Sequence, residues 1–358
     1  MVDWTASMQQ TFEYYTVDSN TWKDKTKIEY VKSCSITWDS ETETLCSASI
    51  DVDDLLEECY VRIYLITIQN GIREKHTLGT FLVQNPGFSF DGKTKTSTVD
   101  AYSPLLELKD NPPPIGYYTP KNKNIMDEAY TLIEDNSRLR VVKASCTDIL
   151  YYDFVAETDD TWITYLIDLV SNANYTIMLD ELGQVLFYPK QDTASLQPVW
   201  TYNDDNSSIL YPELTMSRDL YGIPNTVEVV YSDGDYNYYA TATNDDVNSP
   251  ISTANRGRKI TYRTTNPNIP GVPSGNKEQD LARVEEYAKQ ALRELSTIEY
   301  SITYTHGYCP VRIGDCVRLN YSRSGINNVK AKVISQSIKC ETGCSVTEKA
   351  VYTTSLWG

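Results

Sequence analysis

The stretch "SRDLYGIPNTVEVVYSD", residues 217–233, combines an interruption of regular structure with an alternating segment. Gly222 and Pro224 mark the interruption, and a proline disfavours the helical conformation in the residue before it. From Val227 to Tyr231, apolar side chains recur at every second position, which is the period of a half-buried β-strand. We therefore expect a new β-structured region to begin near residue 215, in the middle of the chain.

The preceding residues 28–102 also show a β pattern. Alternating segments such as "CYVRIYLITI" (59–68) are separated by the pairs Asn70-Gly71 and Asp91-Gly92, which are typical of tight hairpin turns. Because no helical periodicity interrupts them, an antiparallel barrel or sandwich is expected. We place this first β-domain at residues 1–104.

A proline-rich segment, "KDNPPPIGYYTPKN" (109–122), separates this region from one with helical periodicity. One helix is expected in "NIMDEAYTLIED" (124–135) and a second in "TDDTWITYLIDLVSNA" (158–173). Two short strands around a turn at residues 181–183 follow. The pattern predicts a small α+β domain at residues 105–205.

Residues 206–358 return to β structure, with long polar loops and one amphipathic helix at about 277–296. The apolar stripe of that helix consists of Leu281, Val284, Ala288, Ala291, Leu292 and Leu295. The final hairpin "KAKVISQSIKCETGCSVTEKAVY" (330–352) resembles the earlier "GTFLVQNPGFSFDGKTKTSTVDAY" (79–102), because both run strand, Gly-bearing turn, strand and Tyr. We interpret residues 217–233 as the return into a second barrel.

Composition limits the classes of partner. The chain of 358 residues has 32 Lys and Arg against 49 Asp and Glu, a net charge of −17, so specific binding to nucleic acid is not expected. No secretory signal is visible, and no apolar segment approaches the roughly 20 residues that span a bilayer. We expect a soluble, non-secreted chain without membrane insertion. Tyrosine is abundant, with 28 Tyr against 6 Phe, which favours wetted or partner-facing β surfaces.

Catalytic and cofactor motifs are sparse. The chain has two histidines: His306 could activate Cys309 or Cys316 as a nucleophile, or be a turn histidine beside buried thiols, and His76 lies next to a turn. The second interpretation is favoured, so no catalytic, cofactor-binding or metal-binding residue is predicted and we expect no enzyme. The acidic clusters at 51–58 and 243–246 are interpreted as solvated surface.

Eight cysteines leave three alternatives open. Cys309, Cys316, Cys340 and Cys344 could bind zinc, although no pair has the spacing of a zinc knuckle. Disulfides are a second alternative. Buried free thiols are favoured, because a chain without a signal peptide meets a reducing compartment.

Four tyrosine clusters, "EYYT" (13–16), "GYYTP" (116–120), "LYYDF" (150–154) and "DYNYYA" (235–240), suit protein interfaces or saccharide stacking. The interface interpretation is favoured.

The order of segments resembles the phage tail baseplate central hub protein family. The resemblance rests on "LGTFLVQNPGFSFDGKTKTSTVDAYSPLLEL" (78–108), "DTWITYLIDLVSNANYTIMLDELGQVLFYPK" (160–190) and "LYPELTMSRDLYGIPNTVEVVYS" (210–232), followed by the late helix, strand and hairpin. The residues that match its structural signature are Gly79, Asp180, Gly183, Arg218, Asp219, Pro224, Asn225, Gly314 and Asp315.

The resemblance implies a β-rich α+β fold, in which two tube-like antiparallel β-barrel domains (1–104 and 206–358) flank the inserted α+β domain (105–205). It also implies a homotrimeric structural hub in the virion tail baseplate, assembled in the host bacterial cytoplasm. Such a ring would continue the hexameric tail tube and pass DNA through an acidic lumen. Expected partners are the tail tube, spike or tip, tape measure and other baseplate proteins. The chain ends soon after the second barrel, which favours a contractile tail or phage-like particle.

Two other functions remain open. The tyrosine-rich loops could make the chain a carbohydrate- or cell-surface-binding module, and the histidines and carboxylates could serve a cell-wall hydrolase.

Overall fold

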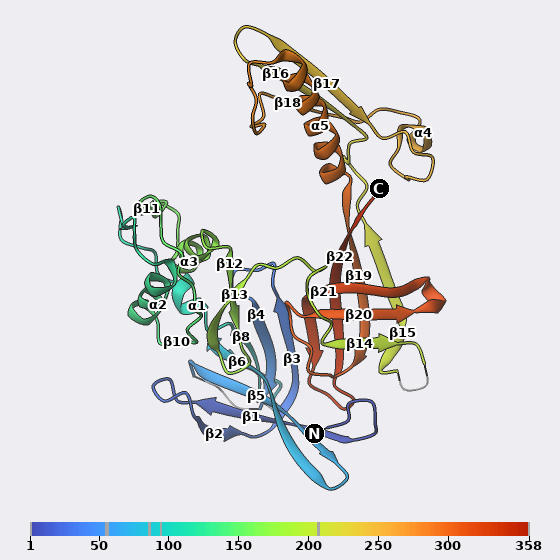
Figure 1. The fold of residues 1–358 in the computed structure, drawn as a ribbon. Helices are drawn as coiled ribbons and strands as arrows, with labels where there is room; N and C mark the ends of the chain where they lie inside the picture. Colours follow the sequence, from blue (N-terminus) through green and yellow to red (C-terminus); the bar gives the residue numbers. More distant parts are fainter. Residues whose placement is uncertain (1, 54–56, 85–86, 94, 206–207, 357–358) are drawn as a thin grey trace. The chain divides into compact units, whose positions relative to one another are not determined.

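The computed structural model describes residues 2–53, 57–84, 87–93, 95–205 and 208–356 (Figure 1). Most of its regular structure consists of β-strands in antiparallel sheets, with few helices, which confirms the predicted β-rich fold class. The chain divides into two compact units: Met1–Leu214 with Thr303–Ala350, and Thr215–Ile302 with Val351–Gly358. The boundaries at residues 104/105 and 205/206 stay predictions.

The first unit is built on a large sheet. Among the described residues, its main path pairs the strands in this order: β15 (Leu210–Arg218), β19 (Thr297–Gly307), β22 (Ser345–Ser355), β21 (Ile326–Lys339), β3 (Val31–Asp39), β4 (Cys46–Val52), β8 (Lys95–Tyr102), β6 (Ile72–Gln84), β5 (Cys59–Gln69), β1 (Gln9–Val17) and β2 (Asp24–Ile28). Beside this path, β20 (Cys316–Tyr321) pairs with β21 and β14 (Trp200–Asn203), and β7 (Ser89–Phe90) pairs with β8. A short 3-10 helix, η1 (Ser322–Ser324), links β20 to β21, and parts of β15, β19 and β22 belong to the second unit.

The hairpin between β5 and β6 forms at the predicted turn. Asn70 and Gly71 have φ angles of 52° and 78°, and a two-residue hairpin turn of this kind requires positive φ at both positions. The strands that it joins bury Val61, Ile63 and Phe81 completely. Each such side chain contributes about 1.5–3 kcal/mol relative to an exposed position.

The predicted α+β region follows β8. Its elements are α1 (Leu106–Lys109), β9 (Tyr118–Thr119), α2 (Ile125–Asn136), β10 (Arg140–Val141), β11 (Phe154–Val155), α3 (Trp162–Ser171), β12 (Tyr175–Leu179) and β13 (Gln184–Pro189). Both predicted helices are confirmed. The Asn124 side chain caps α2, and Thr161 and Thr164 form a capping box at α3, which satisfies amide groups that a helix start leaves unpaired.

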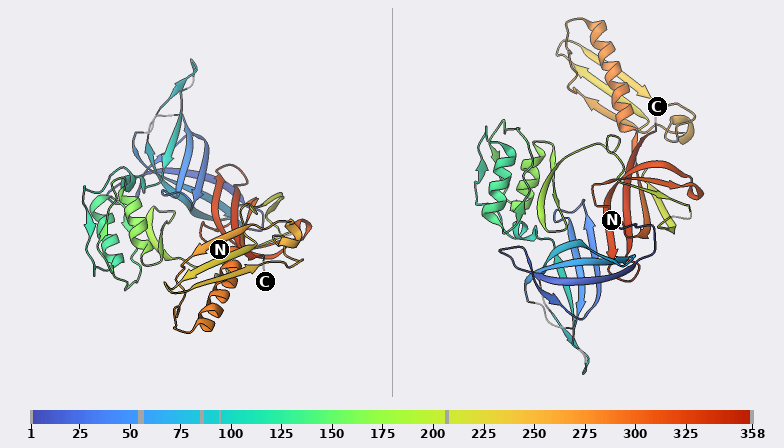
Figure 2. Two further views of the ribbon diagram at one scale, coloured as in Figure 1. Left: turned by 90° about the horizontal axis from the view of Figure 1, so that it is seen from above. Right: turned by 60° about the horizontal axis from the view of Figure 1, so that its bottom comes forward.

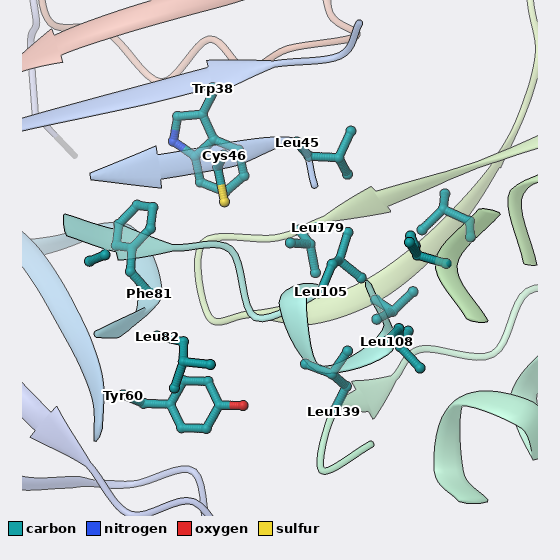
Figure 3. Packing of buried hydrophobic residues seen from close by; sticks show 14 of the residues in the cluster. Trp38, Leu45, Cys46, Tyr60, Phe81, Leu82, Leu105, Leu108, Leu139 and Leu179 are labelled. Carbon is teal, nitrogen blue, oxygen red and sulfur yellow. The ribbon is translucent and has the colours of Figure 1, made fainter. Parts of the chain in front are cut away.

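A common hydrophobic core joins this region to the large sheet. Figure 3 shows Trp38 and Phe81 from the sheet in one cluster with Leu105, Leu108 and Leu179. All five side chains are buried. The α+β region therefore packs on the sheet through its apolar side chains.

The second unit contains the stretch at 217–233, and here the sequence interpretation was wrong. Residues Thr226–Ser232 form β16, as expected for a strand, but β16 pairs with β17 (Asn237–Thr243) and β18 (Thr261–Thr265) in a separate three-stranded sheet. Val227 and Val229 are buried beneath a helix rather than in a barrel. An alternating pattern defines a buried face, but it does not show which sheet the strand joins.

That helix is α5 (Lys277–Leu295), which confirms the predicted helix at 277–296 (Figure 2). Val284, Ala288 and Leu292 are buried against the sheet, whereas Leu281, predicted in the same stripe, is 39% exposed. Among the described residues of this unit, the other helix is α4 (Thr253–Arg256). In the described part of the chain, no helix is long and apolar enough to cross a membrane.

Candidate functional site

Strands β3 and β21 join the N-terminal and C-terminal portions of the first unit. Residues Ser335–Lys339 of β21 pair with Ser35–Asp39 of β3 in an antiparallel ladder. Ile36 and Ile338 lie opposite each other in this ladder, and both are buried in the common core. We call this ladder the junction. It makes one continuous sheet out of segments from opposite ends of the chain.

The two portions on either side of the junction share one strand order. The N-terminal portion pairs as β3-β4-β8-β6-β5-β1, and the C-terminal portion as β15-β19-β22-β21-β20-β14. When β2 and β7 are left out and the six remaining strands of each portion are numbered along the chain, both orders become 2-3-6-5-4-1. One difference is that β1 pairs with β5 antiparallel, whereas β14 pairs with β20 in parallel. The strand order is therefore repeated within the chain.

The predicted turn residues Asp180 and Gly183 lie between β12 and β13. The Gln184 amide donates to Asp180 Oδ1 at 2.8 Å, and Gly183 has a φ of 81°. A Cβ on Gly183 would lie 2.8 Å from a ring carbon of Trp22, which follows β1. This position therefore requires glycine both for its conformation and for its contact with the sheet.

A buried arginine holds the same turn from the sheet side. Arg62 of β5 donates to the carbonyl of Leu182 at 3.3 Å and to the Thr80 hydroxyl at 2.8 Å. The Thr80 hydroxyl in turn donates to the carbonyl of Glu181 at 2.9 Å. Asp24 supplies the opposite charge, 3.2 Å from Arg62. These contacts fix the β12–β13 turn against the large sheet.

Gly79 lies next to Thr80 on β6, opposite Ile63 and beside a shift in the β5–β6 register. A Cβ there would lie 2.5 Å from the Phe81 ring.

Gly314 and Asp315 lie in the turn before β20. Gly314 has a φ of 89°, and Asp315 Oδ2 accepts a hydrogen bond from the Arg312 backbone amide at 2.9 Å. Burial raises the pKa of Asp315.

Asp180, Gly314 and Asp315 line the same cavity of about 570 Å³ in the first unit. Its apolar walls come from β12, β13 and the junction strands, and its charged rim includes an ion pair between Arg312 and Glu181. Burial raises the pKa of Glu181, and Arg312 opposes that shift.

The other four signature residues lie in or lead into the second unit. Arg218 donates to the Tyr300 hydroxyl at 3.0 Å, and Asp219 accepts from a backbone amide two residues later at 2.7 Å. Pro224 is buried next to Asn225, which is fully buried. The Asn225 side chain donates to the carbonyls of Ile251 and Arg258 and accepts from the Ile260 amide. Three of the nine signature residues, Asp180, Gly314 and Asp315, therefore line one cavity, but the nine together form no common site.

Strands of the C-terminal portion bring together a buried polar cluster, of which only His306 could be singled out from the sequence. Glu348 of β22 accepts hydrogen bonds from Tyr304 at 2.6 Å, Gln336 at 2.6 Å and Tyr202 at 3.2 Å. His306 Nε2 lies 3.3 Å from Glu348 Oε1, and both side chains are fully buried. Burial acts to lower the pKa of His306, but interactions with the Glu348 carboxylate and with Cys309 together outweigh it and raise that pKa to about 10. Burial opposes ionisation of Glu348, but His306 and the hydrogen bonds lower its pKa.

The structure brings His306 and Cys309 together without making them accessible. Cys309 Sγ lies 3.9 Å from His306 Nδ1 and 3.3 Å from the Tyr202 hydroxyl, and Cys309 is buried. His306 lies on β19 rather than in a turn. The other histidine, His76, bonds the Thr67 hydroxyl at 3.0 Å, and burial lowers its pKa. Because both side chains are buried, a substrate cannot reach the His306–Cys309 pair in this structure.

All eight cysteines are free thiols in the structure; six are buried, whereas Cys59 and Cys146 are partly exposed. Cys34, Cys340 and Cys344 lie together beside the junction, where contact with Cys34 and burial raise the pKa of Cys340. The described residues contain no group of three or more His, Cys, Asp or Glu that could hold a metal ion. Part of the acidic cluster at 51–58 lies outside the described residues.

The tyrosine clusters divide between core and surface. Tyr14 and Tyr238 are buried, and Tyr117 packs edge-on against the ring of Trp162. Tyr151 and Tyr152 of the α+β region are both exposed, at 81% and 83%. The clustering of tyrosines in the sequence therefore predicted a partner-facing position for Tyr14 and Tyr238, which lie in the core.

Comparison with known proteins identifies the fold. No family model and no curated protein matches the chain. The tail protein from Neisseria meningitidis MC58 is 13% identical and covers 98% of both chains with a TM-score of 0.60. The 43 kDa tail protein of prophage MuSo2 from Shewanella oneidensis is 12% identical, with 95% and 98% coverage and a TM-score of 0.57. A chain of the Francisella PdpA-VgrG complex is 9% identical, with a TM-score of 0.56 over 96% of this chain and 58% of the other. The chain has the fold of these two tail proteins and of the chain in the PdpA-VgrG complex, which confirms the predicted resemblance at the level of the fold.

Proposed function

We propose that this chain is the structural hub of a phage or phage-like tail baseplate, in which three copies form a ring that continues the hexameric tail tube. The observation that carries the proposal is the repeated strand order on the two sides of the junction. We interpret the two repeats as the tube-like barrels. Three chains with two repeats each supply six similar units, so a three-fold ring presents a six-fold surface to a hexameric tube.

The similar solved structures support this role. Two are described as tail proteins, one of them from a prophage, and a third lies in a complex that contains VgrG. We propose that the chain binds the tail tube on one side and a spike or tip protein on the other. Contacts with the tape measure protein and other baseplate proteins, and assembly in the host cytoplasm, belong to the same proposal.

The proposed mechanism is mechanical and not enzymatic. Of the described residues, His306 and Cys309 most resemble a catalytic pair. Both are buried, however, and both interact with neighbouring side chains of the buried cluster. The exposed tyrosines of the α+β region, Tyr151 and Tyr152, are assigned to contacts with neighbouring proteins. The ring leaves a central bore through which DNA passes.

Mass photometry of the purified full-length chain tests the proposal. The expected result is a species with three times the mass of the chain. A monomer that binds purified cell-wall glycans would instead support the carbohydrate-binding alternative. Release of peptidoglycan fragments that is lost in a His306→Gln variant would support the hydrolase.

A further inference from the structure

One face of the joined sheet carries a continuous field of small hydroxyl side chains. In the first row, Ser337 of β21 lies opposite Thr37 of β3, which lies opposite Ser47 of β4. In the next row, Ser35 lies opposite Ser49. Residues that pair across a sheet project to the same side, so these hydroxyls share one face.

Hydrogen bonds in a third row confirm that these side chains point to the same side of the sheet. Ser33 pairs with Asp51, and Asp51 pairs with Thr98 of β8. The hydroxyls of Ser33 and Thr98 both donate to the Asp51 carboxylate. The row therefore consists of side chains that touch one another on one side of the sheet.

The hydroxyl field continues across the junction onto the C-terminal portion. Thr347 of β22 and Thr305 of β19 bond through their hydroxyls at 2.9 Å. Their chain neighbours Glu348 and Tyr304 are buried on the opposite side, so Thr305 and Thr347 lie on the hydroxyl side. We call this surface the hydroxyl face: Ser33, Ser35, Thr37, Ser47, Ser49, Thr98, Thr303, Thr305, Ser335, Ser337, Ser345 and Thr347.

The hydroxyl face is nearly neutral in a strongly acidic chain. Within the first unit, register and alternation place among these hydroxyls three aspartates, Asp39, Asp51 and Asp100, and two lysines, Lys339 and Lys349. Their formal sum is 2 − 3 = −1, against −17 for the whole chain. Most of the net negative charge therefore lies on other surfaces.

The α+β region lies on the other side of the same strands. Trp38 and Ile338 of the junction pack into the common core with Leu179 of β12. On the hydroxyl side, Ser35, Thr37, Ser47 and Ser337 are exposed. The inserted residues thus cover one side of the joined sheet and leave these hydroxyls open to solvent.

We propose that the hydroxyl face is the channel wall of the ring, a surface that touches a passing polyanion without holding it. This inference rests on the proposed function. Tight binding of a phosphate backbone depends on lysines and arginines that displace its counterions. Serine and threonine hydroxyls hold water and supply no such charge. A hydroxylated and nearly neutral wall therefore binds DNA only weakly. This wall differs from the acidic wall that the net charge of the chain led us to expect.

Size-selective labelling tests this placement. Variants Ser35→Cys and Ser337→Cys of the full-length chain are compared with Glu134→Cys, an exposed position on α2. Intact rings are treated with a small maleimide or with a polymer-linked maleimide too bulky for the bore. The mass added to each variant is compared with the mass added to the wild-type chain, which corrects for labelling of the native cysteines. We expect all three variants to take the small reagent and only Glu134→Cys to take the bulky one.

Each other outcome has a distinct meaning. Intact rings whose Ser35→Cys and Ser337→Cys take the bulky reagent as fast as Glu134→Cys would overturn the channel wall and leave the ring standing. If the small reagent did not label Ser35→Cys and Ser337→Cys, the hydroxyl face would lie in a contact between subunits, and the channel-wall proposal would also be overturned. A chain that stays monomeric would overturn the proposed function and this inference together.

Lysine substitutions add a second readout. The double variant Ser35→Lys/Ser337→Lys places six new positive charges around one bore in a ring of three chains. We expect it to retain a short DNA duplex at one per ring, with affinity falling steeply as salt rises. The control Glu134→Lys should retain none in this manner. If the double variant bound several duplexes per ring, the lysines would lie on an outer surface, which would contradict the proposal that the hydroxyl face lines the bore.

Discussion

Ser337 of β21 and Thr37 of β3 lie opposite each other in an antiparallel ladder, although they come from opposite ends of the chain. Their pairing turns two sheet portions with the same strand order into one surface. A chain that carries a repeated unit on a shared sheet can contribute two neighbouring positions to a ring.

Loss of the Glu348 carboxylate should destabilise the first unit strongly. In Glu348→Gln, buried His306 loses its opposite charge, and breaking such a pair costs about 3–5 kcal/mol. Urea denaturation of the full-length chain measures the change. The double variant Glu348→Gln/His306→Gln should recover part of the loss, because no lone buried charge remains. The exposed control Glu134→Gln should stay within about 0.5 kcal/mol of wild type, and an equal loss there would refute the assignment.

The same pair predicts a loss of stability at alkaline pH. Folding raises the pKa of His306 from its ordinary 6.5 to about 10, so its contribution is complete below pH 6.5 and is lost as pH rises through 10. Glu348 has the opposite sign, because its lowered pKa is a contribution lost as pH falls. The free energy of unfolding should therefore decline from pH 6.5 to pH 9 in wild type. A His306→Gln variant with the same decline would show that another group is responsible.

Gly183→Ala should cost more than a comparable glycine substitution elsewhere. The new Cβ would meet Trp22 at 2.8 Å in a residue whose φ is 81°. Gly234 in the β16–β17 turn has a φ of 95° with nothing within 4 Å of its Cβ position, so Gly234→Ala measures conformational strain alone. We expect Gly183→Ala to lose about 1–3 kcal/mol beyond the control by thermal denaturation. Equal losses would mean that the Trp22 contact is unimportant.

Asn225→Ala should loosen the second unit selectively. The substitution removes three buried hydrogen bonds and leaves their backbone partners unsatisfied, a cost of about 2–4 kcal/mol. Hydrogen exchange should speed up in β16 and β18 while β5 and β6 keep their protection. The exposed substitution Asn237→Ala in β17 serves as control. Uniform acceleration across both units would contradict a local role.

Local features of the fold could be predicted from the sequence because short-range physics determines them. The apolar spacing of α5 and the turn chemistry of Asn70-Gly71 depend on neighbouring residues alone. The strand at Val227–Tyr231 was predicted for the same reason. Its parallel partner β18 was not, because the long polar segment at 244–260 separates β18 from β17 in the sequence and shows no pairing preference.

The buried Glu348 cluster could not be predicted, because its members come from β14, β19, β21 and β22 and meet only once the strand register is set. The hydroxyl face has the same origin. Its serines and threonines alternate with apolar residues in the sequence, as in any half-exposed strand. Only the pairing of β3 with β21 aligns the two sets on one continuous surface.

Electron microscopy of the purified full-length chain, or of tail tips that contain it, tests the central claim most directly. The account predicts rings of three chains with a central hole and six similar density lobes around it, two from each chain. Monomers, or assemblies in which the two sheet portions of one chain do not border a common hole, would contradict it.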